Sequence, residues 1–308
     1  MILRQISRRE RAGARRRGGS GAARRIAGAA GMVVAALLVA SPSAAQEAPH
    51  YEVIASGERG RTYHDHYARN LISQLRAFRI RNRETTGSGE NLDLLADGRA
   101  DIAFAQADVY AVRLRANRER YAGFTVIGRL ADECVYIAYR VGGPIASFAA
   151  LAGPVDGRKP KIAVGPAGGG MSGTWSFMAS LEPGLAIAEV ANTGGTLALN
   201  QLSIGIFDAV AWVTDPRNLD HVLLRAVQAN PELDLLVVQA PKFEHALANG
   251  TVVYESKDVA VTTAADSQQI RTICTGAMIF ARPDANPRLV EAVSEVLSFQ
   301  RERILRLH

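Results

Sequence analysis

Hydroxyl, amide and glycine residues gather in residues 84–109, ETTGSGENLDLLADGRADIAFAQADV. Thr86 and Ser88 stand in a glycine-containing turn, and Ser88 is placed to cap the helix expected over residues 91–96. Gln106 ends an apolar run that is typical of a buried strand. Because open α/β sheets bind ligands at the carboxyl ends of their strands, these three side chains are expected to converge on a small-molecule site.

A strand, a turn rich in glycine and hydroxyl residues and a helix start are expected four times, at residues 57–62, 86–89, 168–174 and 194–196. The free N–H groups and the positive dipole end of a helix N-terminus bind carboxylate or phosphate. Each turn taken singly can be a tight connection between a strand and a helix. Four of them in one chain favour a cleft that holds an anion.

The first 45 residues are predicted to be a signal peptide with cleavage before Gln46. They contain nine arginines, one glutamate and an apolar run at residues 26–40, which is shorter than the ~20 residues of a membrane span. An uncleaved membrane anchor is the alternative. Without this leader the formal net charge falls from +6 to −2, so the basic character that would indicate nucleic-acid binding belongs to the leader.

Cofactor and metal sites are not expected. Residues 168–173 have the Gly-x-Gly-x-x-Gly spacing of dinucleotide-binding units, and Glu189 lies at roughly the right distance. The pattern lies mid-chain, however, behind an export signal, and it resembles the other glycine turns. His64 and His66 would point away from each other on a helix, so we expect them to bind no metal.

Strands alternating with helices indicate α/β layers with largely parallel pairing. A helix with Tyr63 and Tyr67 on its buried face is expected early, another over residues 109–120, and an amphipathic helix over residues 287–307. Residues 124–130 and 134–140 are expected to be a pair of strands. Cys134 and Cys274 could form a disulfide in an oxidising compartment, and two buried free thiols are the alternative that their spacing leaves open.

The segment TGSGENLDLLADGRADIAFAQADV, residues 86–109, resembles a motif of the TAXI-type solute-binding proteins, which serve tripartite (TRAP) carriers. The similarity continues in order through SGERGRTYHDHYARNL, KIAVGPAGGGMSGTW, FDAVAWVTDP and TVVYESKDVAVTT. It therefore covers nearly all of the chain after the leader. The first of these motifs is fairly specific, and the others support it through their order.

This resemblance implies a type II-like periplasmic binding protein fold, with two α/β lobes joined by crossover strands and a ligand cleft between them. Residues 46–140 would form the first part of lobe 1, residues 141–260 lobe 2, and residues 261–308 the return to lobe 1 with a C-terminal helix. It also implies capture of a small organic anion, such as glutamate or a dicarboxylate, in the periplasm. The implied partners are TRAP permease membrane subunits, and no nucleic acid is expected to bind. The resemblance implies a binding protein that catalyses no reaction.

The resemblance also implies which residues contact the ligand. Arg61 stands where the family has a glycine and could add a charge-assisted contact to a carboxylate, and Gly169 stands where a serine is typical. Trp212 and Asp215 lie at the facing strand end of the second lobe. The candidate ligand-binding residues are Gly60, Arg61, Thr62, Tyr63, Thr86, Ser88, Gln106, Gly168, Gly169, Ser172, Thr174, Trp212 and Asp215.

Two other classes of function remain open from the sequence. The same fold could report a ligand to a membrane kinase, and the genes beside this one would distinguish a kinase from permease subunits. It could also act as a periplasmic lyase, for which Glu58, Asp108 and Asp215 are the candidate acid/base groups. Substituting these carboxylates would abolish turnover in an enzyme but would change only the affinity of a binding protein.

Overall fold

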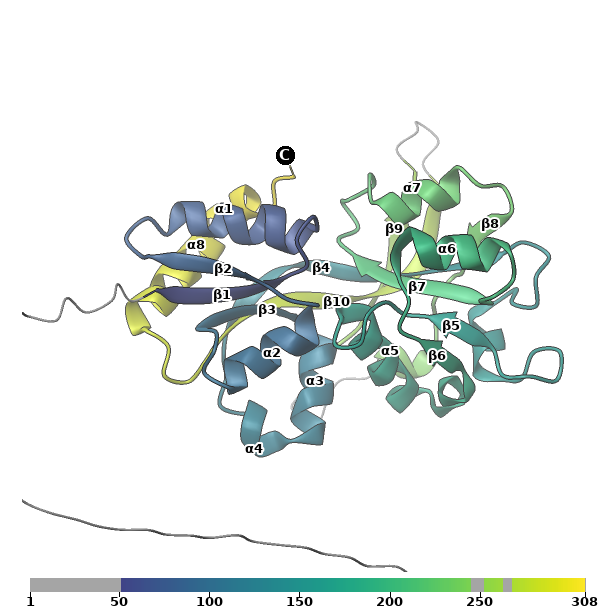
Figure 1. Ribbon diagram of the computed structural model, residues 1–308, viewed down its shortest axis with the longest axis horizontal. Coiled ribbons are helices and arrows are strands. Elements are labelled where there is room, and N and C mark those ends of the chain that lie inside the picture. Colours follow the sequence, from purple (N-terminus) through teal and green to yellow (C-terminus); the bar gives the residue numbers. More distant parts are fainter. Residues whose placement is uncertain (1–50, 245–251, 263–267, 308) are drawn as a thin grey trace, which may run out of the picture. The chain divides into compact units, whose positions relative to one another are not determined.

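The computed structural model describes residues 51–244, 252–262 and 268–307 (Figure 1). The signal peptide expected over residues 1–45 and its cleavage before Gln46 lie outside the described residues. Within the described residues, no helix is both long enough and apolar enough to cross a membrane.

The strands of the described residues form one mixed sheet. Their bounds are β1 Glu52–Gly57, β2 Ile80–Glu84, β3 Ile102–Gln106, β4 Thr125–Arg140, β5 Lys161–Ala163, β6 Glu189–Ala191, β7 Ala209–Thr214, β8 Leu233–Leu235, β9 Glu255–Ala260 and β10 Gln269–Ala281. Their order in space is β2-β1-β3-β10-β4-β7-β5-β6, with β8 paired to β4 and β9 paired to β10. We call β1, β2 and β3 with their helices the first half, and β5, β6 and β7 with theirs the second half.

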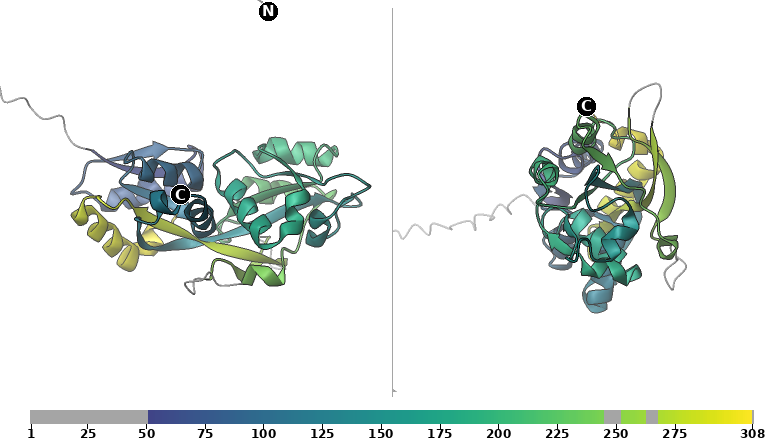
Figure 2. Two further views of the ribbon diagram at one scale, coloured as in Figure 1. Left: turned by 90° about the horizontal axis from the view of Figure 1, so that it is seen from below. Right: turned by 90° about the vertical axis from the view of Figure 1, so that its right-hand side faces the viewer.

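Pairing is parallel within each half and antiparallel wherever β4 or β10 takes part. The expectation of largely parallel pairing is therefore wrong at the centre of the sheet. The two long strands β4 and β10 carry the chain between the halves, as Figure 2 shows, and they do so in opposite directions. Because both strands belong to both halves, the lobe boundaries expected near residues 140 and 260 stay a prediction.

A single strand, β4, replaces the two strands expected at residues 124–130 and 134–140. Asp132 and Glu133, which separate these two apolar runs, remain in the strand. Glu133 is buried and accepts a hydrogen bond from Tyr63, so the acidic pair does not end the strand. Continuous pairing with β10 on one side and β7 on the other gives β4 its length.

Helices cover both faces of the sheet (Figure 1). They are η1 Tyr63–Ala68, α1 Arg69–Gln74, α2 Ser88–Ala96, α3 Ala107–Ala116, α4 Arg118–Tyr121, η2 Phe148–Ala152, α5 Gly170–Leu181, η3 Pro183–Ile187, α6 Gly195–Ser203, α7 Val222–Gln228, η4 Pro241–Glu244 and α8 Pro287–Ile304. The first expected helix is confirmed as the π-helical η1 followed by α1, with Tyr67 fully buried. The helix expected over residues 109–120 is interrupted at Asn117, whose side chain caps α4.

Successive residues of the strands point to opposite faces of the sheet, and in the first half they pack into two separate hydrophobic cores. Ile54 and Phe104 pack with α1 and α8, whereas Ala55 and Ala103 pack with α2. The second half repeats this arrangement, with one core beneath α5 and another beneath α6 and α7. Each half is therefore a sheet between two helical layers, which leaves the turns at its strand ends free to form a site.

A disulfide joins the two strands that cross between the halves. Cys134 on β4 and Cys274 on β10 are direct register partners in antiparallel pairing. Their side chains are bonded to each other and fully buried. Of the two alternatives left open by the sequence, the structure has the disulfide.

Candidate functional site

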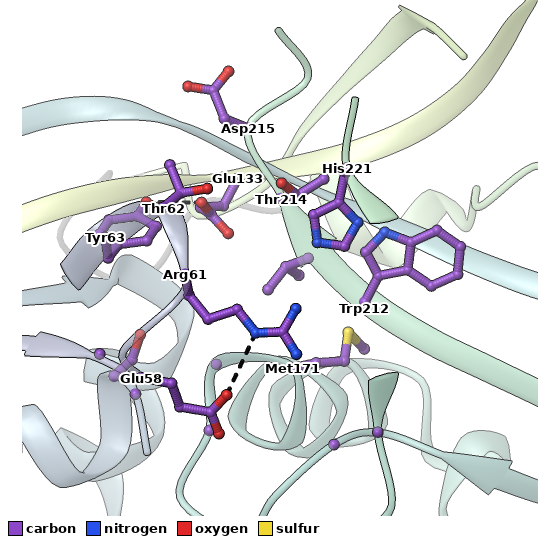
Figure 3. Close-up of a pocket in the computed structure, with 18 of the residues that line it drawn as sticks. Glu58, Arg61, Thr62, Tyr63, Glu133, Met171, Trp212, Thr214, Asp215 and His221 are labelled. Atoms are coloured by element: carbon purple, nitrogen blue, oxygen red, sulfur yellow. Dashed lines mark hydrogen bonds and ion pairs between the residues drawn. The ribbon is translucent and has the colours of Figure 1, made fainter. Parts of the chain in front are cut away.

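A cavity of about 400 Å³ lies where the strand ends of the two halves meet (Figure 3). The first half contributes the turn after β1, the turn before α2 and the end of β3. The second half contributes the turns before α5 and α6 and the end of β7 with the loop that follows. This volume lies within the range of small-molecule sites, which is roughly 300–1,000 Å³.

Most of the candidate residues line this cavity. Those that do are Gly60, Arg61, Thr62, Tyr63, Thr86, Ser88, Gln106, Gly169, Trp212 and Asp215. Gly168, Ser172 and Thr174 do not. Thr174 is fully buried behind the wall, where its hydroxyl oxygen accepts a 3.2 Å hydrogen bond from Gln106 Nε2. It therefore supports a wall residue and is not itself part of the cavity surface.

Ser88 links two elements of the first half. The sequence predicts that it caps α2, but it does not. The helix begins at Ser88 itself, after Gly87 in the N-cap position. The Ser88 hydroxyl instead accepts a hydrogen bond from the backbone N–H of Gln106 (3.2 Å) and donates one to Gln106 Oε1 (3.3 Å). Glu90 receives hydrogen bonds from the backbone N–H and the hydroxyl of Thr86. The two bonds between Ser88 and Gln106 fix the orientation of these side chains at the cavity wall.

Three helices begin at the cavity without a side-chain cap. The N-cap residues of α2, α5 and α6 are Gly87, Gly169 and Gly194, and none of them has a side chain that could accept from the first N–H groups. All three residues line the cavity. Positive dipole ends from both halves therefore face the same space, which favours an anion there.

Gly170, at the start of α5, lies so close to the side chain of Gln106 that there is no room for a side chain of its own. A Cβ atom at this position would lie 2.0 Å from Gln106 Oε1 and 3.5 Å from Val213. Any larger residue would displace the Gln106 amide from its hydrogen bonds with Ser88 and Thr174. The glycine therefore lets α5 approach β3 closely enough for the two halves to share the wall.

Arg61 places a permanent positive charge in the cavity. Its guanidinium group extends past Met171 towards His221, and its Nε atom lies 3.6 Å from Glu58 Oε2 (Figure 3). The side chain is 48% exposed, so it can still exchange this weak surface pair for a ligand. Among the described residues that line the cavity, Arg61 is the one arginine, and there is no lysine.

Glu133 is a site residue that the sequence analysis missed. It is almost fully buried, lines the cavity and accepts a 2.7 Å hydrogen bond from the Tyr63 hydroxyl. Burial, together with the nearby carboxylates of Asp215 and Asp108, raises the pKa of Glu133 to about 8. At neutral pH the cavity therefore contains a mostly uncharged carboxylic acid beside Tyr63, which reduces its repulsion of an anion.

Trp212 and His221 form an aromatic part of the wall, and His221 was also missed from the sequence. Their rings are nearly parallel, with centroids 6.3 Å apart and 7° between the planes. Burial, together with the nearby charge of Arg61, lowers the pKa of His221 to about 4, so the imidazole is neutral at pH 7. Trp212 Nε1 and His221 Nδ1 are buried without a hydrogen-bond partner among the described residues.

The three carboxylates considered for lyase chemistry are all paired within the protein. Glu58 lies against Arg61, and Asp215 accepts hydrogen bonds from Tyr67 and Arg217. Asp108 lies outside the cavity lining, fully buried, where it accepts from Tyr254 and its burial raises its pKa. Among the described residues, no group of three or more His, Cys, Asp or Glu side chains could hold a metal ion.

Comparison with solved structures identifies the fold. XAC2383 from Xanthomonas citri bound to ATP is 14% identical, with 83% of this chain and 88% of that chain covered and a TM-score of 0.51. The same protein bound to chloride ion is 15% identical with the same coverage and a TM-score of 0.50. MatC from Rhodopseudomonas palustris with bound malate is 17% identical, with 81% and 84% covered and a TM-score of 0.49.

Likeness at these identities concerns the fold alone, which is the mixed α/β fold of two-lobed periplasmic binding proteins. No curated protein matches the sequence significantly. The sequence model of one family matches residues 67–299, which include parts of both halves and all of the cavity wall except its first turn. The chain belongs to the NMT1-like family.

Proposed function

We propose that this chain is a periplasmic binding protein that captures a small organic carboxylate by closure of its two halves. The observation that carries this proposal is the convergence of the Arg61 guanidinium with the uncapped starts of α2, α5 and α6 in one cavity. A guanidinium group forms charge-assisted, often bidentate hydrogen bonds with a carboxylate. Helix N-termini add N–H donors from both sides of the same space.

Closure follows from the division of these groups between the halves. Arg61, Ser88 and Gln106 come from the first half, whereas Gly169, Gly194 and Trp212 come from the second. A ligand held by both sets stabilises the closed arrangement over an open one, which is a shift of population and involves no reaction. Pairing of Glu58, Asp108 and Asp215 with residues of the protein itself also favours binding over acid/base chemistry.

For the partner, we propose a TRAP-type permease that receives the solute in the periplasm. The support is the resemblance of residues 86–109 to the TAXI-type motif, together with the leader that precedes Gln46. N-terminal sequencing of the exported protein should give Gln46 as the first residue. Co-purification with the membrane subunits encoded beside this gene would identify the carrier, and a kinase in their place would support a sensor instead.

The proposal is tested by calorimetric titration of residues 46–308, freed of bound ligand by unfolding and refolding, with monocarboxylates, dicarboxylates and amino acids. Arg61→Gln should weaken carboxylate binding by about tenfold or more, because a hydrogen bond to a charged group contributes about 1.5–3 kcal/mol. The matched control is Arg59→Gln, which removes an exposed arginine from the same turn outside the cavity lining.

This control should bind like the wild type. Carboxylates that bind Arg61→Gln as tightly as the wild-type protein would contradict the assignment of the anion to Arg61. A folded, ligand-free protein that binds none of the carboxylates would contradict the proposed function.

A further inference from the structure

We infer that the ligand is an aromatic monocarboxylate, whose carboxylate meets Arg61 and whose flat ring lies against the aromatic wall formed by Trp212 and His221. The inference rests on the proposed function and narrows the class of ligand. It depends on the aromatic wall of the cavity, on the apolar side chains beside that wall and on the distribution of charge in the lining, and it departs from the glutamate or dicarboxylate implied by the sequence.

The aromatic wall is held in a fixed orientation by its own packing. Trp212 on β7 is the direct register partner of Tyr136 on β4, and their rings stack with centroids 5.7 Å apart and planes 12° apart. His221 continues the nearly parallel series, and the rings of Trp212 and His221 both line the cavity. Figure 3 shows the rings of Trp212 and His221 next to the end of the Arg61 side chain. A rigid flat surface of this kind favours a flat ligand, because stacking then costs little ordering of the protein.

Apolar side chains extend this surface. Met171, in the first turn of α5, places its thioether between the end of Arg61 and the Trp212 ring (Figure 3). Sulfur of this kind makes favourable contacts with aromatic rings. Phe104 and Leu223 also line the cavity. Trp212 Nε1 and His221 Nδ1 have no partner among the described residues, and buried polar atoms are rarely left so unless a bound molecule or water completes the wall.

The charges of the lining match one carboxylate and disfavour a second. Arg61 is its one arginine among the described residues, whereas the acidic side chains are Glu58, Asp215 and Asp220, with Glu133 kept mostly uncharged at neutral pH by its raised pKa. Arg217, which could otherwise receive a second carboxylate, is bound to Asp215 at 2.6 Å. A second ligand carboxylate would therefore be desolvated without a second free arginine to pair with it, which costs free energy.

The experiment is calorimetric titration of the ligand-free protein, residues 46–308, with matched probes. Benzoate and 2-naphthoate are the aromatic monocarboxylates, cyclohexanecarboxylate removes the flat ring, and succinate and glutamate replace the ring by a second charged group. We expect benzoate to bind about three- to tenfold tighter than cyclohexanecarboxylate, the range that an aromatic pair contributes beyond buried area. Succinate and glutamate should bind more weakly than both aromatic probes.

Variants of Trp212 assign the preference to the ring. Trp212→Leu should bring the ratio between benzoate and cyclohexanecarboxylate close to one, whereas Trp212→Phe, which keeps a ring, should retain most of it. Circular dichroism and the melting temperature verify that each variant folds. Because Trp175 is the other of the chain's two tryptophans, Trp175→Phe makes fluorescence specific for Trp212, and benzoate should shift or quench that emission.

The outcomes separate this inference from the proposed function. Succinate or glutamate binding as tightly as the aromatic probes, or a ratio unchanged in folded Trp212→Leu, would overturn the aromatic assignment and leave carboxylate capture standing. Loss of all carboxylate binding in Arg61→Gln, with aromatic preference in the wild type, supports both. Failure of every carboxylate to bind the folded wild-type protein would overturn both.

Discussion

The backbone N–H of Gly89 donates a 3.0 Å hydrogen bond to the carbonyl oxygen of Gly168, which joins the start of α2 to the turn before α5. The two halves therefore touch through their backbones at the edge of the cavity. A Cβ atom at Gly89 would lie 2.8 Å from that oxygen and 3.3 Å from the Gly168 Cα. Both distances are shorter than ordinary van der Waals contact, so this contact allows only glycine at position 89 without movement.

Gly89→Ala is predicted to weaken ligand binding, because the added methyl group pushes the turn of residue 168 away and disfavours the closed arrangement. Overpacking of this kind typically costs about 1–3 kcal/mol, which corresponds to a loss of affinity of about fivefold or more. Calorimetry with the best-binding carboxylate measures the loss. Gly153→Ala is the control, since a Cβ atom there meets nothing within 4 Å. Equal affinities of the two variants would show that the contact does not limit closure.

Glu133 is predicted to make the stability of the protein depend on pH. Burial raises its pKa in the folded protein from the ordinary 4.5 to about 8. Below pH 4.5 the group is protonated in both states and has no effect. Between pH 4.5 and about 8 the unfolded chain loses the proton while the folded chain keeps it. The free energy of unfolding therefore falls with rising pH, by about 1.4 kcal/mol per unit for one such group.

Glu133→Gln should remove this slope, because the amide is neutral at every pH and still offers an oxygen to the Tyr63 hydroxyl. Urea titrations at pH 5 to 8 measure the effect, and the variant should gain on the wild type as the pH rises. The exposed Glu232→Gln is the matched control and should follow the wild-type curve. A Glu133→Gln variant with the wild-type slope would contradict the burial of a protonated acid at this position.

The parts of the site that local sequence determines could be predicted. Thr86 lies in a turn, Ser88 at the start of a helix and Gln106 at the end of a strand, and the three elements are close together in the chain. The spacing of the glycines between them predicts that these side chains meet. The four glycine turns likewise mark helix starts, and all four of them line the cavity. In each case the pattern of glycines and the hydrophobic periodicity are enough to predict where the helix begins and where the strand ends.

Contacts between distant residues fix the parts that could not be predicted. Glu133 lies in the cavity because β4 continues through Asp132 and pairs with strands on both sides, and its hydrogen bond reaches back 70 residues to Tyr63. His221 belongs to the loop after β7, and its ring lies nearly parallel to that of Trp212 in the wall. The resemblance implies ligand contacts at Gly168, Ser172 and Thr174, but these residues lie outside the cavity lining, and Thr174 instead accepts a hydrogen bond from Gln106.

Removal of the disulfide is predicted to destabilise the protein strongly. Cys134 and Cys274 are 140 residues apart in the chain, so their bond restricts a long loop of the unfolded state. Removing a native disulfide typically costs about 2–5 kcal/mol. The double variant Cys134→Ala and Cys274→Ala should unfold at lower urea concentration than the wild type, and a reductant should shift only the wild-type curve. Equal midpoints without reductant would contradict a stabilising role.

Tyr67→Phe is predicted to lower ligand affinity through a contact outside the aromatic wall. The Tyr67 hydroxyl donates a 2.8 Å hydrogen bond to Asp215 Oδ2, which connects η1 of the first half with the end of β7 in the second. Both side chains are buried, so little water can replace the lost donor. Because the bond spans the halves, its loss should disfavour the closed state by about 1.5–3 kcal/mol, the range for hydrogen bonds to charged groups.

The control is Tyr110→Phe, which removes a tyrosine hydroxyl bonded to the Tyr121 carbonyl within the first half. Both variants should unfold more easily than the wild type, since each loses a hydrogen bond. Tyr67→Phe alone should also bind carboxylate more weakly, because its lost bond joins the two halves. Calorimetry at matched temperature separates the two effects, and equal affinities would place the Tyr67 bond outside the equilibrium between open and closed states.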